Sequence, residues 1–328
     1  MRFTWQLITC IFFAATIGCS PEKTSFEFVV LPDTQSYVEE HPEIYLKQMQ
    51  WIARNKNRFS FVIHEGDITQ NNSTGEWQIA KKGFNMLNGK VPYTFCLGNH
   101  DMGSVPGKFA DVRNTEKANN FFKVEALKQN SNLLASFPSG TIDNLCSQFN
   151  IAGYKWFVFS LEFGPRNKTI AWANKIIKSH PDAKIIINTH AYLYEDSTWQ
   201  DGEDWWQAQA YGVGKETGDN AVNNGKQLWN KLVAKHPNVI MVFCGHVLKS
   251  GVGTLVSTGE NGNKVYQMLA NYQKGVEGSK NGGDGFLRIV KMDIDNKRIS
   301  VSTYSPWLDA YKKDADHDFT FKNVDFLN

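Results

Sequence analysis

Five apolar runs along this chain are each followed closely by a residue of a type that binds metal ions. Short, nearly continuous apolar runs predict strands buried on both faces of a sheet that helices cover. Loops at the ends of such strands are where a rigid scaffold carries its chemistry. The runs are 26–31, 59–64, 91–97, 183–187 and 239–244, and the residues after them are Asp33, Asp67, Asn99, His190 and His246.

Taken alone, any one of these residues is more simply a turn aspartate, a turn asparagine or a core histidine. Their repetition at five successive strand ends favours one shared site. The richest of the five loops is Gly98-Asn99-His100-Asp101, where an amide, an imidazole and a carboxylate follow a glycine that lets main chain approach closely.

Helical patterns alternate with the first strands. Pro42 marks the start of a helix over 42–54, and Ser73 with Glu76 fits a capping box that opens a second helix. Strand and helix in alternation are typical of parallel units. Later in the chain, Asn261-Gly262 and Asp295-Asn296 separate pairs of strands that predict antiparallel hairpins. The sheets are therefore expected to be mixed.

Two long stretches interrupt this alternation. Residues 102–145, with a helical patch at 119–129, are expected to form a lobe beside the site. Residues 194–222 combine several tryptophans with acidic residues directly after His190. They either form a wall of the substrate pocket or fold their tryptophans beneath the loop with the acids facing water, and both alternatives stay open. The acidic segment 314–318 is expected to be a solvated tail, since Phe319 stands where a calcium loop needs glycine.

The set of motifs resembles the calcineurin-like metallophosphoesterase family over about residues 26–304. The segments 31–35, 245–251 and 267–273 look like one secreted bacterial branch of that family. The resemblance implies an α/β fold of two packed mixed β-sheets flanked by helices. It also implies a metal-dependent phosphoesterase that hydrolyses a phosphomonoester or a phosphodiester. The motifs that carry the resemblance are Asp33-x-Gln35, Gly66-Asp67, Gly98-Asn99-His100-Asp101, His190 and Gly245-His246.

The same resemblance implies two divalent ions that share a bridging hydroxide. Asp67 would bridge the ions, and Asp33 would hold the second one. His100 would protonate the leaving group, and Asp101 would hold the ring of His100. The full set of metal ligands implied in this way is Asp33, Gln35, Asp67, Asn99, His190 and His246.

Two positions depart from the family pattern. The family usually carries histidine at the positions of Gln35 and Leu248, and both missing imidazoles belong to the ion held by Asp33. We therefore expect one tight ion of Mn, Fe or Zn and a weaker one of Mn or Mg with oxygen ligands. His64 either substitutes for a missing imidazole or is turned away by strand alternation.

A second reading is a non-catalytic surface binding protein built on a degenerate phosphoesterase fold. Retention of His100 and Asp101 favours the enzyme, because a binder has no use for an acid that protonates a leaving group.

The N-terminus predicts export. Arg2 precedes an apolar segment over 7–15, and Thr16-Ile17-Gly18-Cys19 looks like a bacterial lipobox. We expect a signal peptide over 1–18, a tether over 19–25 and one metallophosphoesterase domain over 26–328. Acylation of Cys19 would anchor the protein to a membrane, facing the periplasm or the cell surface. A plain secretory signal and an uncleaved anchor are the alternatives.

Composition supports one large domain and narrows the partners. The 328 residues are 41% hydrophobic and 21% charged, which suffices for a sizeable core. A net charge of +2 with no long basic run argues against a nucleic-acid-binding tract, leaving a phosphate ester as the expected partner. Beyond the signal remain Cys96, Cys146 and Cys244, an odd count that predicts no disulfide framework but leaves a single bridge open.

Overall fold

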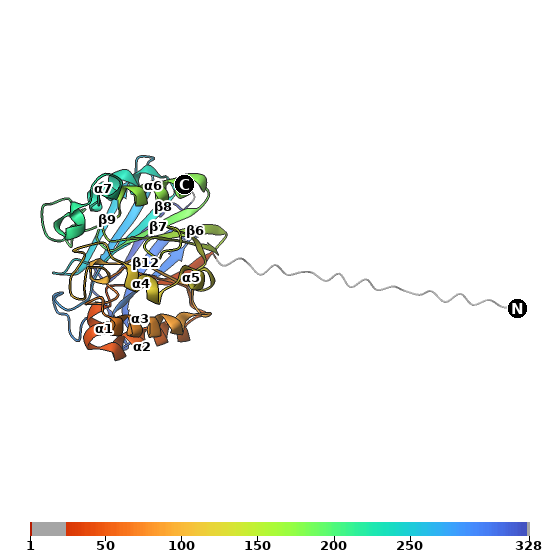
Figure 1. Ribbon diagram of the computed structural model, residues 1–328. Helices are drawn as coiled ribbons and strands as arrows, with labels where there is room; N and C mark the ends of the chain where they lie inside the picture. Colours follow the sequence, from red (N-terminus) through yellow and green to blue (C-terminus); the bar gives the residue numbers. More distant parts are fainter. Residues whose placement is uncertain (2–23, 327–328) are drawn as a thin grey trace.

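The computed structural model describes Met1 and residues 24–326, so the predicted signal peptide and most of the tether, with Cys19, lie outside the described residues. Two seven-stranded β-sheets pack face to face, and helices cover both outer faces (Figure 1). The first sheet has the order β13-β12-β11-β1-β2-β3, with β14 also paired to β12, and the second has the order β4-β5-β6-β7-β8-β10-β9. This confirms the predicted α/β fold of two mixed sheets.

The first sheet consists of β1 (Ser25–Leu31), β2 (Phe59–His64), β3 (Tyr93–Phe95), β11 (Leu287–Asp293), β12 (Arg298–Ser305), β13 (Ala310–Lys312) and β14 (Asp318–Lys322). The second consists of β4 (Leu133–Ser136), β5 (Leu145–Ile151), β6 (Tyr154–Leu161), β7 (Lys184–Thr189), β8 (Val239–Cys244), β9 (Val252–Thr258) and β10 (Lys264–Ala270). The helices are α1 (Gln35–Glu40), α2 (Pro42–Arg54), α3 (Thr74–Leu87), α4 (Glu116–Phe121), α5 (Val124–Asn130), α6 (Asn167–Ser179) and α7 (Gly225–Lys231).

The core between the sheets is aromatic. Phe28 of β1 and Phe61 of β2 stack with their ring centroids 4.5 Å apart, and Phe243 of the second sheet meets Phe28 edge to face at 5.8 Å. All three side chains are fully buried. Such rigid, close-packed contacts hold the two sheets at a fixed separation, so the strand ends of one sheet face those of the other.

The outer faces are covered by amphipathic helices. The apolar sides of α2 and α3 pack on the first sheet, while α6 and α7 pack on the second. The predicted start of α3 is confirmed: the main-chain N–H of Glu76 donates to Ser73 Oγ, and Glu76 Oε2 accepts from the Ser73 N–H at 2.8 Å. Figure 1 shows α1, α2 and α3 on one side of the sandwich and α6 and α7 on the other.

Parallel pairing decides where the site lies. In the first sheet β1, β2 and β3 are parallel neighbours, and in the second sheet β6, β7, β8 and β10 are. The carboxyl ends of parallel strands lie at the same edge of a sheet. The loops that follow β1, β2, β3, β7 and β8 carry the five residues singled out from the sequence.

Three segments differ from expectation. Residues 102–145 were expected to form a lobe beside the site, but their last part joins the second sheet, because β4 pairs with β5 at its edge. The helical patch at 119–129 divides into α4 and α5 near Phe122, whose ring packs against Trp77 and Phe84 of α3. The expected solvated tail leads directly into β14, which pairs with β12 and packs Phe319 and Phe321 against the sandwich core.

The structure also bears on the cysteines and on membrane-spanning helices. Cys96, Cys146 and Cys244 are free and buried, so the single bridge that the sequence left open is not formed among them. Within residues 24–326, no helix is both long enough and apolar enough to cross a membrane.

Candidate metal centre

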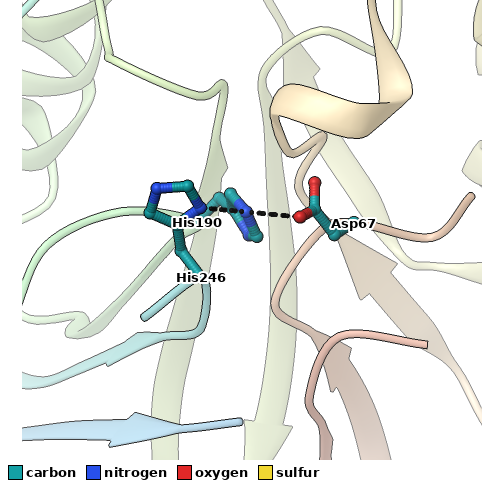
Figure 2. Close-up of side chains that lie close together, drawn as sticks. All are labelled: Asp67, His190 and His246. Carbon is teal, nitrogen blue, oxygen red and sulfur yellow. Dashed lines mark hydrogen bonds and ion pairs between the residues drawn. The ribbon is translucent and has the colours of Figure 1, made fainter. Parts of the chain in front are cut away.

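Four acceptor atoms converge at the edge shared by the two sheets. His190 Nε2 lies 3.0 Å from Asp67 Oδ2, 3.1 Å from Asn99 Oδ1 and 3.1 Å from His246 Nδ1. Asp67 and Asn99 follow strands of the first sheet, whereas the two histidines follow strands of the second. Figure 2 shows Asp67 facing His190 and His246. Among the residues that the structure describes, Asp67, His190 and His246 are the one group of acids, histidines and cysteines close enough together to share an ion.

Main-chain carbonyls fix the two rings. His190 Nδ1 lies 2.9 Å from the carbonyl oxygen of Glu65, and His246 Nε2 lies 2.8 Å from that of Trp206. A carbonyl oxygen only accepts, so these two ring nitrogens carry the hydrogens. In the neutral rings His190 Nε2 and His246 Nδ1 therefore present lone pairs to each other. Metal-binding histidines are held in this way by carbonyl groups behind them.

The acceptor atoms of this cluster are stable together only with a positive charge among them. Two lone pairs, a carboxylate oxygen and an amide oxygen within about 3 Å repel one another unless a positive charge lies among them. In the metal-free protein a proton on His190 Nε2 supplies that positive charge: burial lowers the pKa of His190, but the carboxylates of Asp67 and Asp33 outweigh burial and raise it to about 9. Burial and the neighbouring His190 lower the pKa of His246 to about 3. The residues present fit a divalent transition metal at this point.

Two glycines are required for the acids to reach their places. A Cβ on Gly98 would lie 2.1 Å from Asp67 Oδ1, and a Cβ on Gly245 would lie 2.0 Å from Asp33 Oδ1. Asp67 itself has a φ of 46°, a left-handed conformation that is uncommon for any residue with a side chain. Its Oδ1 accepts a hydrogen bond of 2.9 Å from the main-chain N–H of His100. The glycines of these two motifs therefore make room for carboxylates.

His100 stands beside the cluster and faces the same pocket. Its Nδ1 donates to the carbonyl oxygen of Gln70 at 2.7 Å, since that oxygen only accepts. Its Nε2 lies 4.0 Å from Asp67 Oδ2, and its ring packs on Phe109 with centroids 3.9 Å apart. The imidazole is thus held from behind and from one side, with Nε2 directed towards the metal cluster.

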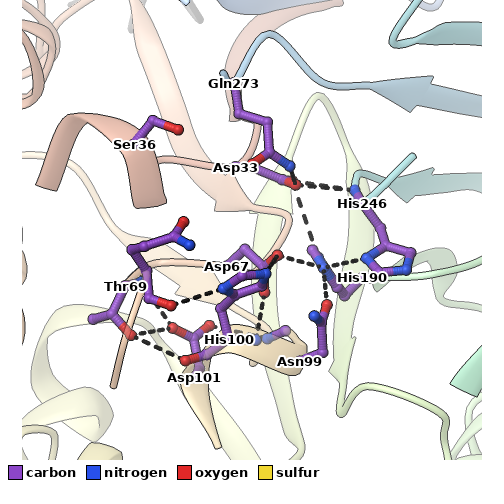
Figure 3. A network of polar contacts seen from close by, with 12 residues as sticks. Asp33, Ser36, Asp67, Thr69, Asn99, His100, Asp101, His190, His246 and Gln273 are labelled. Atoms are coloured by element: carbon purple, nitrogen blue, oxygen red, sulfur yellow. Dashed lines mark hydrogen bonds and ion pairs between the residues drawn. The ribbon is translucent and has the colours of Figure 1, made fainter. Parts of the chain in front are cut away.

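The structure corrects the role expected of Asp101. Its carboxylate does not hold the His100 ring, which Gln70 holds instead. Asp101 accepts from the main-chain N–H groups of Gly98, Ile68 and Thr69 at 2.9–3.0 Å, and from the Thr69 hydroxyl (Figure 3). Burial and the charge of Asp67 raise its pKa to about 6. Asp101 ties the loop after β2 to the loop after β3, so it positions both Asp67 and His100.

Asp33 is surrounded by donors, and two of them were missed from the sequence. Its Oδ2 accepts from Asn271 Nδ2 and Gln273 Nε2 at 3.0 Å each and from the His246 N–H at 3.1 Å (Figure 3). Burial raises its pKa well above the usual value, although His190 opposes the shift. Both amides follow β10, which runs parallel to β8. Polar residues directly after an apolar run were the signal that could have found them.

The two departures from the family pattern lie on the pocket. Gln35 opens α1, and its Oε1 is buried without a hydrogen-bond partner. Leu248 lines the same pocket. His64 is not a substitute ligand, because its Nδ1 accepts from the Gly66 N–H and its Nε2 bonds the Thr34 hydroxyl at 2.9 Å. Both of its ring nitrogens are engaged away from the cluster, as strand alternation allowed.

The aromatic segment 194–222 was expected either to form a wall of the pocket or to pack its tryptophans beneath the loop, and it does both. Trp205, Trp206 and Tyr211 line a pocket of about 350 Å³, whose other lining residues include Asp67, Asn99, His100 and His246. Trp199 instead stacks on Trp229 with ring centroids 4.9 Å apart, beneath the loop. Trp205, Trp206 and Tyr211 therefore form a wall of the pocket, whereas Trp199 packs against the protein.

The family model for calcineurin-like phosphoesterases matches residues 26–250, more than half of the chain. This chain belongs to the calcineurin-like phosphoesterase family. The matched range contains every predicted site residue and ends before Asn271 and Gln273. The recognition from sequence motifs is thereby confirmed for the family.

Individual proteins resemble this chain only distantly. The uncharacterized protein YvnB of Bacillus subtilis (strain 168) is 29% identical over 298 residues, covering 88% of this chain but only 20% of YvnB. The NAD nucleotidase NadN of Haemophilus influenzae is 15% identical with a TM-score of 0.46, covering 88% of this chain and 49% of NadN. GAP50 of Plasmodium, an anchor in the inner membrane complex, is 12% identical with a TM-score of 0.43 over 93% of both chains. This chain thus spans about a fifth of YvnB and half of NadN.

Proposed function

We propose that this protein is a metal-dependent phosphoesterase that cleaves a phosphomonoester or a phosphodiester. One observation carries the proposal: four convergent acceptor atoms lie beside an imidazole whose free nitrogen is directed at them. His100 lines the same pocket as Asp67, Asn99 and His246, and its Nε2 lies 4.0 Å from Asp67 Oδ2. Ester hydrolysis needs both positive charge on the phosphoryl group and a proton for the leaving oxygen.

The first ion is held by the four convergent groups. A divalent ion bound there would supply positive charge to the phosphoryl oxygens and would lower the pKa of water enough for it to act as a nucleophile near neutral pH. The chain's own part is to hold the ligands rigidly, through the carbonyls of Glu65 and Trp206 behind the two rings. Two imidazoles favour Mn, Fe or Zn at this position. The ligands are Asp67, Asn99, His190 and His246.

The second ion, in this proposal, is bound more weakly and by oxygen atoms. Asp33 Oδ2 is already engaged by three N–H donors, which leaves Oδ1 as the less occupied oxygen. The unpartnered Oε1 of Gln35 is a second oxygen on the same pocket. A set made of Asp33, Gln35 and Asp67 has no imidazole, so it suits hard ions such as Mg²⁺ or Mn²⁺.

His100 supplies the proton. Because the Gln70 carbonyl holds Nδ1–H, the proton that can be transferred is the one on Nε2. His100 Nε2 lies 4.0 Å from Asp67 Oδ2. Asp101 accepts four hydrogen bonds, which hold the loop that carries His100 against the loop after β2. A surface binding protein would need neither feature, which favours the enzyme over that alternative.

Hydrolysis of p-nitrophenyl phosphate and bis(p-nitrophenyl) phosphate by metal-stripped protein tests the proposal. We expect no turnover without metal and turnover of at least one ester after Mn²⁺ is restored. Asp67→Asn should lose both bound metal and activity, while Asp295→Asn, an exposed aspartate in a turn, should keep both. Full metal binding with no turnover across a wider panel of esters would instead identify a binding protein.

A further inference from the structure

The most exposed large aromatic side chain beside the metal cluster is Trp205. Its exposed fraction is 58%, and its ring stacks on Trp206 with centroids 3.7 Å apart and an interplanar angle of 28°. Trp206 in turn meets the ring of His246 edge to face at 5.5 Å. Trp205 is therefore two ring contacts away from a predicted metal ligand, with one face covered and the rest open.

The main chain on both sides of Trp205 is held in place by hydrogen bonds. The main-chain N–H of Trp206 donates to Asp204 Oδ1 at 2.8 Å, and Asp204 Oδ2 accepts from the Tyr194 hydroxyl. The carbonyl of Trp206 is fixed by His246 Nε2–H. The residues on both sides of Trp205 are thus pinned. A preorganised aromatic surface loses little conformational entropy when a ligand stacks on it.

The lining of the pocket beyond its aromatic residues is mostly polar, with Leu248 as the aliphatic exception. Amides of Gln35, Gln70 and Gln273 lie on it, with the Ser36 hydroxyl and the Glu39 carboxylate. A volume of 350 Å³ fits a small molecule, at the low end of ligand pockets. These groups offer hydrogen bonds to ring heteroatoms or hydroxyl groups of a ligand.

We propose that Trp205 is the stacking surface for a flat ring in the leaving group of the phosphate ester. This proposal rests on the phosphoesterase function and names its substrate class. Two sources carry the shared chemistry: the base of a nucleoside monophosphate and the phenol ring of an aryl phosphate such as phosphotyrosine. Stacking tolerates either, because every aromatic ring presents a π face.

Binding without turnover gives the first test. Saturation-transfer NMR should detect adenosine, tyrosine amide or both on the wild-type protein, and should not detect glycerol. Trp205→Ala should remove the signal and Trp205→Phe should keep it. Tyr311→Ala, which alters an exposed aromatic ring away from the pocket, should keep it as well. Circular dichroism checks that each variant is folded.

Kinetics give the second test, with AMP, phosphotyrosine and glycerol 3-phosphate as substrates. For the ring esters, Trp205→Ala should raise KM by about 5- to 30-fold with kcat nearly unchanged. The KM for glycerol 3-phosphate should not move. Preference for AMP or for phosphotyrosine identifies the source of the ring.

The two tests separate the proposal from the function on which it rests. Ring binding that needs Trp205, with no hydrolysis of any ester, would support the subsite and reject the phosphoesterase. The proposal is overturned if neither ring compound binds the wild type. It is equally overturned if Trp205→Ala binds them as well as the wild type, or raises KM equally for glycerol 3-phosphate.

Discussion

The Trp206 carbonyl oxygen lies 2.8 Å from Nε2 of His246 and so decides which nitrogen of that ring faces the cluster. The contact joins a loop of the second sheet, remote in sequence, to the metal site. Any change that displaces the main chain at Trp206 should therefore also turn the ring of His246, a proposed metal ligand. The aromatic wall and the metal cluster act as one structural unit.

Metal titration should reveal two unequal sites. We expect calorimetry of metal-stripped protein to show one tight Mn²⁺ ion and one weak ion, with activity rising as the weak site fills. Gln35→His adds the missing imidazole and should tighten the second ion by about tenfold, or about 1.4 kcal/mol. Gln129→His, on the exposed side of α5, is the matched control and should change neither ion. Two equally tight ions in the wild type would contradict this view of Gln35 and Leu248.

Loss of the proton donor should depend on the leaving group. His100→Asn should lower turnover of an alkyl phosphate by about 10²–10⁴, with metal content unchanged. An ester of nitrophenol needs little protonation and should lose less. His180→Asn, at the end of α6, should leave both rates intact. Small and equal losses on the two esters would remove His100 from the mechanism.

Asp101 should matter for stability as well as for rate. Asp101→Asn loses part of a buried acceptor that holds four donors, and should lower the free energy of unfolding by about 1–3 kcal/mol. Urea unfolding of metal-free protein measures this directly. Asp295→Asn should have an effect near zero. An Asp101 variant as stable as the wild type would mean that the two loops hold together without the carboxylate.

Glu162 should give the metal-free protein an acid-sensitive component of stability. It is buried between Arg113 and Arg166, with Nε and Nη2 of Arg166 at 2.9 and 2.8 Å. Burial raises its pKa, but the two guanidinium groups outweigh burial and lower the pKa below the ordinary 4.5. A depressed folded-state pKa contributes stability that is complete above the unfolded pKa and lost as pH falls through the folded one.

The stability difference between wild type and Glu162→Gln should therefore be largest near neutral pH and shrink as pH falls below about 4.5. Thermal melts in chelator across this range provide the measurement. Glu116→Gln, in the first turn of α4, should show no comparable trend. A difference independent of pH would indicate that the carboxylate acts through shape alone.

Membrane attachment through Cys19 stays a proposal, since that residue lies outside the described residues. The wild-type protein should sediment with membranes and be released by detergent. Cys19→Ala should yield soluble or unprocessed protein, because a lipid chain can no longer be added there. Cys10→Ala, within the apolar segment of the signal, is the control. Wild-type protein found soluble without detergent would contradict the anchor.

The sequence predicted the parts of this molecule that depend on local pattern. Apolar runs predicted the buried strands. The polar residues after them meet at one edge of the sandwich, because parallel strands bring their carboxyl ends to the same edge. Ser73 with Glu76 gave the start of α3 for a similarly local reason. These features need only neighbours in the chain.

Features that depend on pairing between distant segments were missed. Asn271 and Gln273 reach Asp33 only because β10 pairs in parallel with β8, and nothing local to residues 267–273 specifies that neighbour. The partner of the His100 ring was assigned to Asp101, although a main-chain carbonyl takes that place. Carbonyl acceptors have no side-chain signature, so sequence patterns cannot distinguish them. The strand β14 was likewise hidden, because its alternating pattern had no recognised partner.

The four convergent ligands come in equal numbers from the two sheets, Asp67 and Asn99 from one and His190 and His246 from the other. An ion bound among them is therefore a cross-link across the open edge of the sandwich. Pulling the sheets apart at that edge would require the ion to leave first. A ligand present at a hundred times its dissociation constant adds about 2.7 kcal/mol to apparent stability by mass action. The availability of metal would then govern how long the folded protein survives proteases, quite apart from whether it turns over substrate.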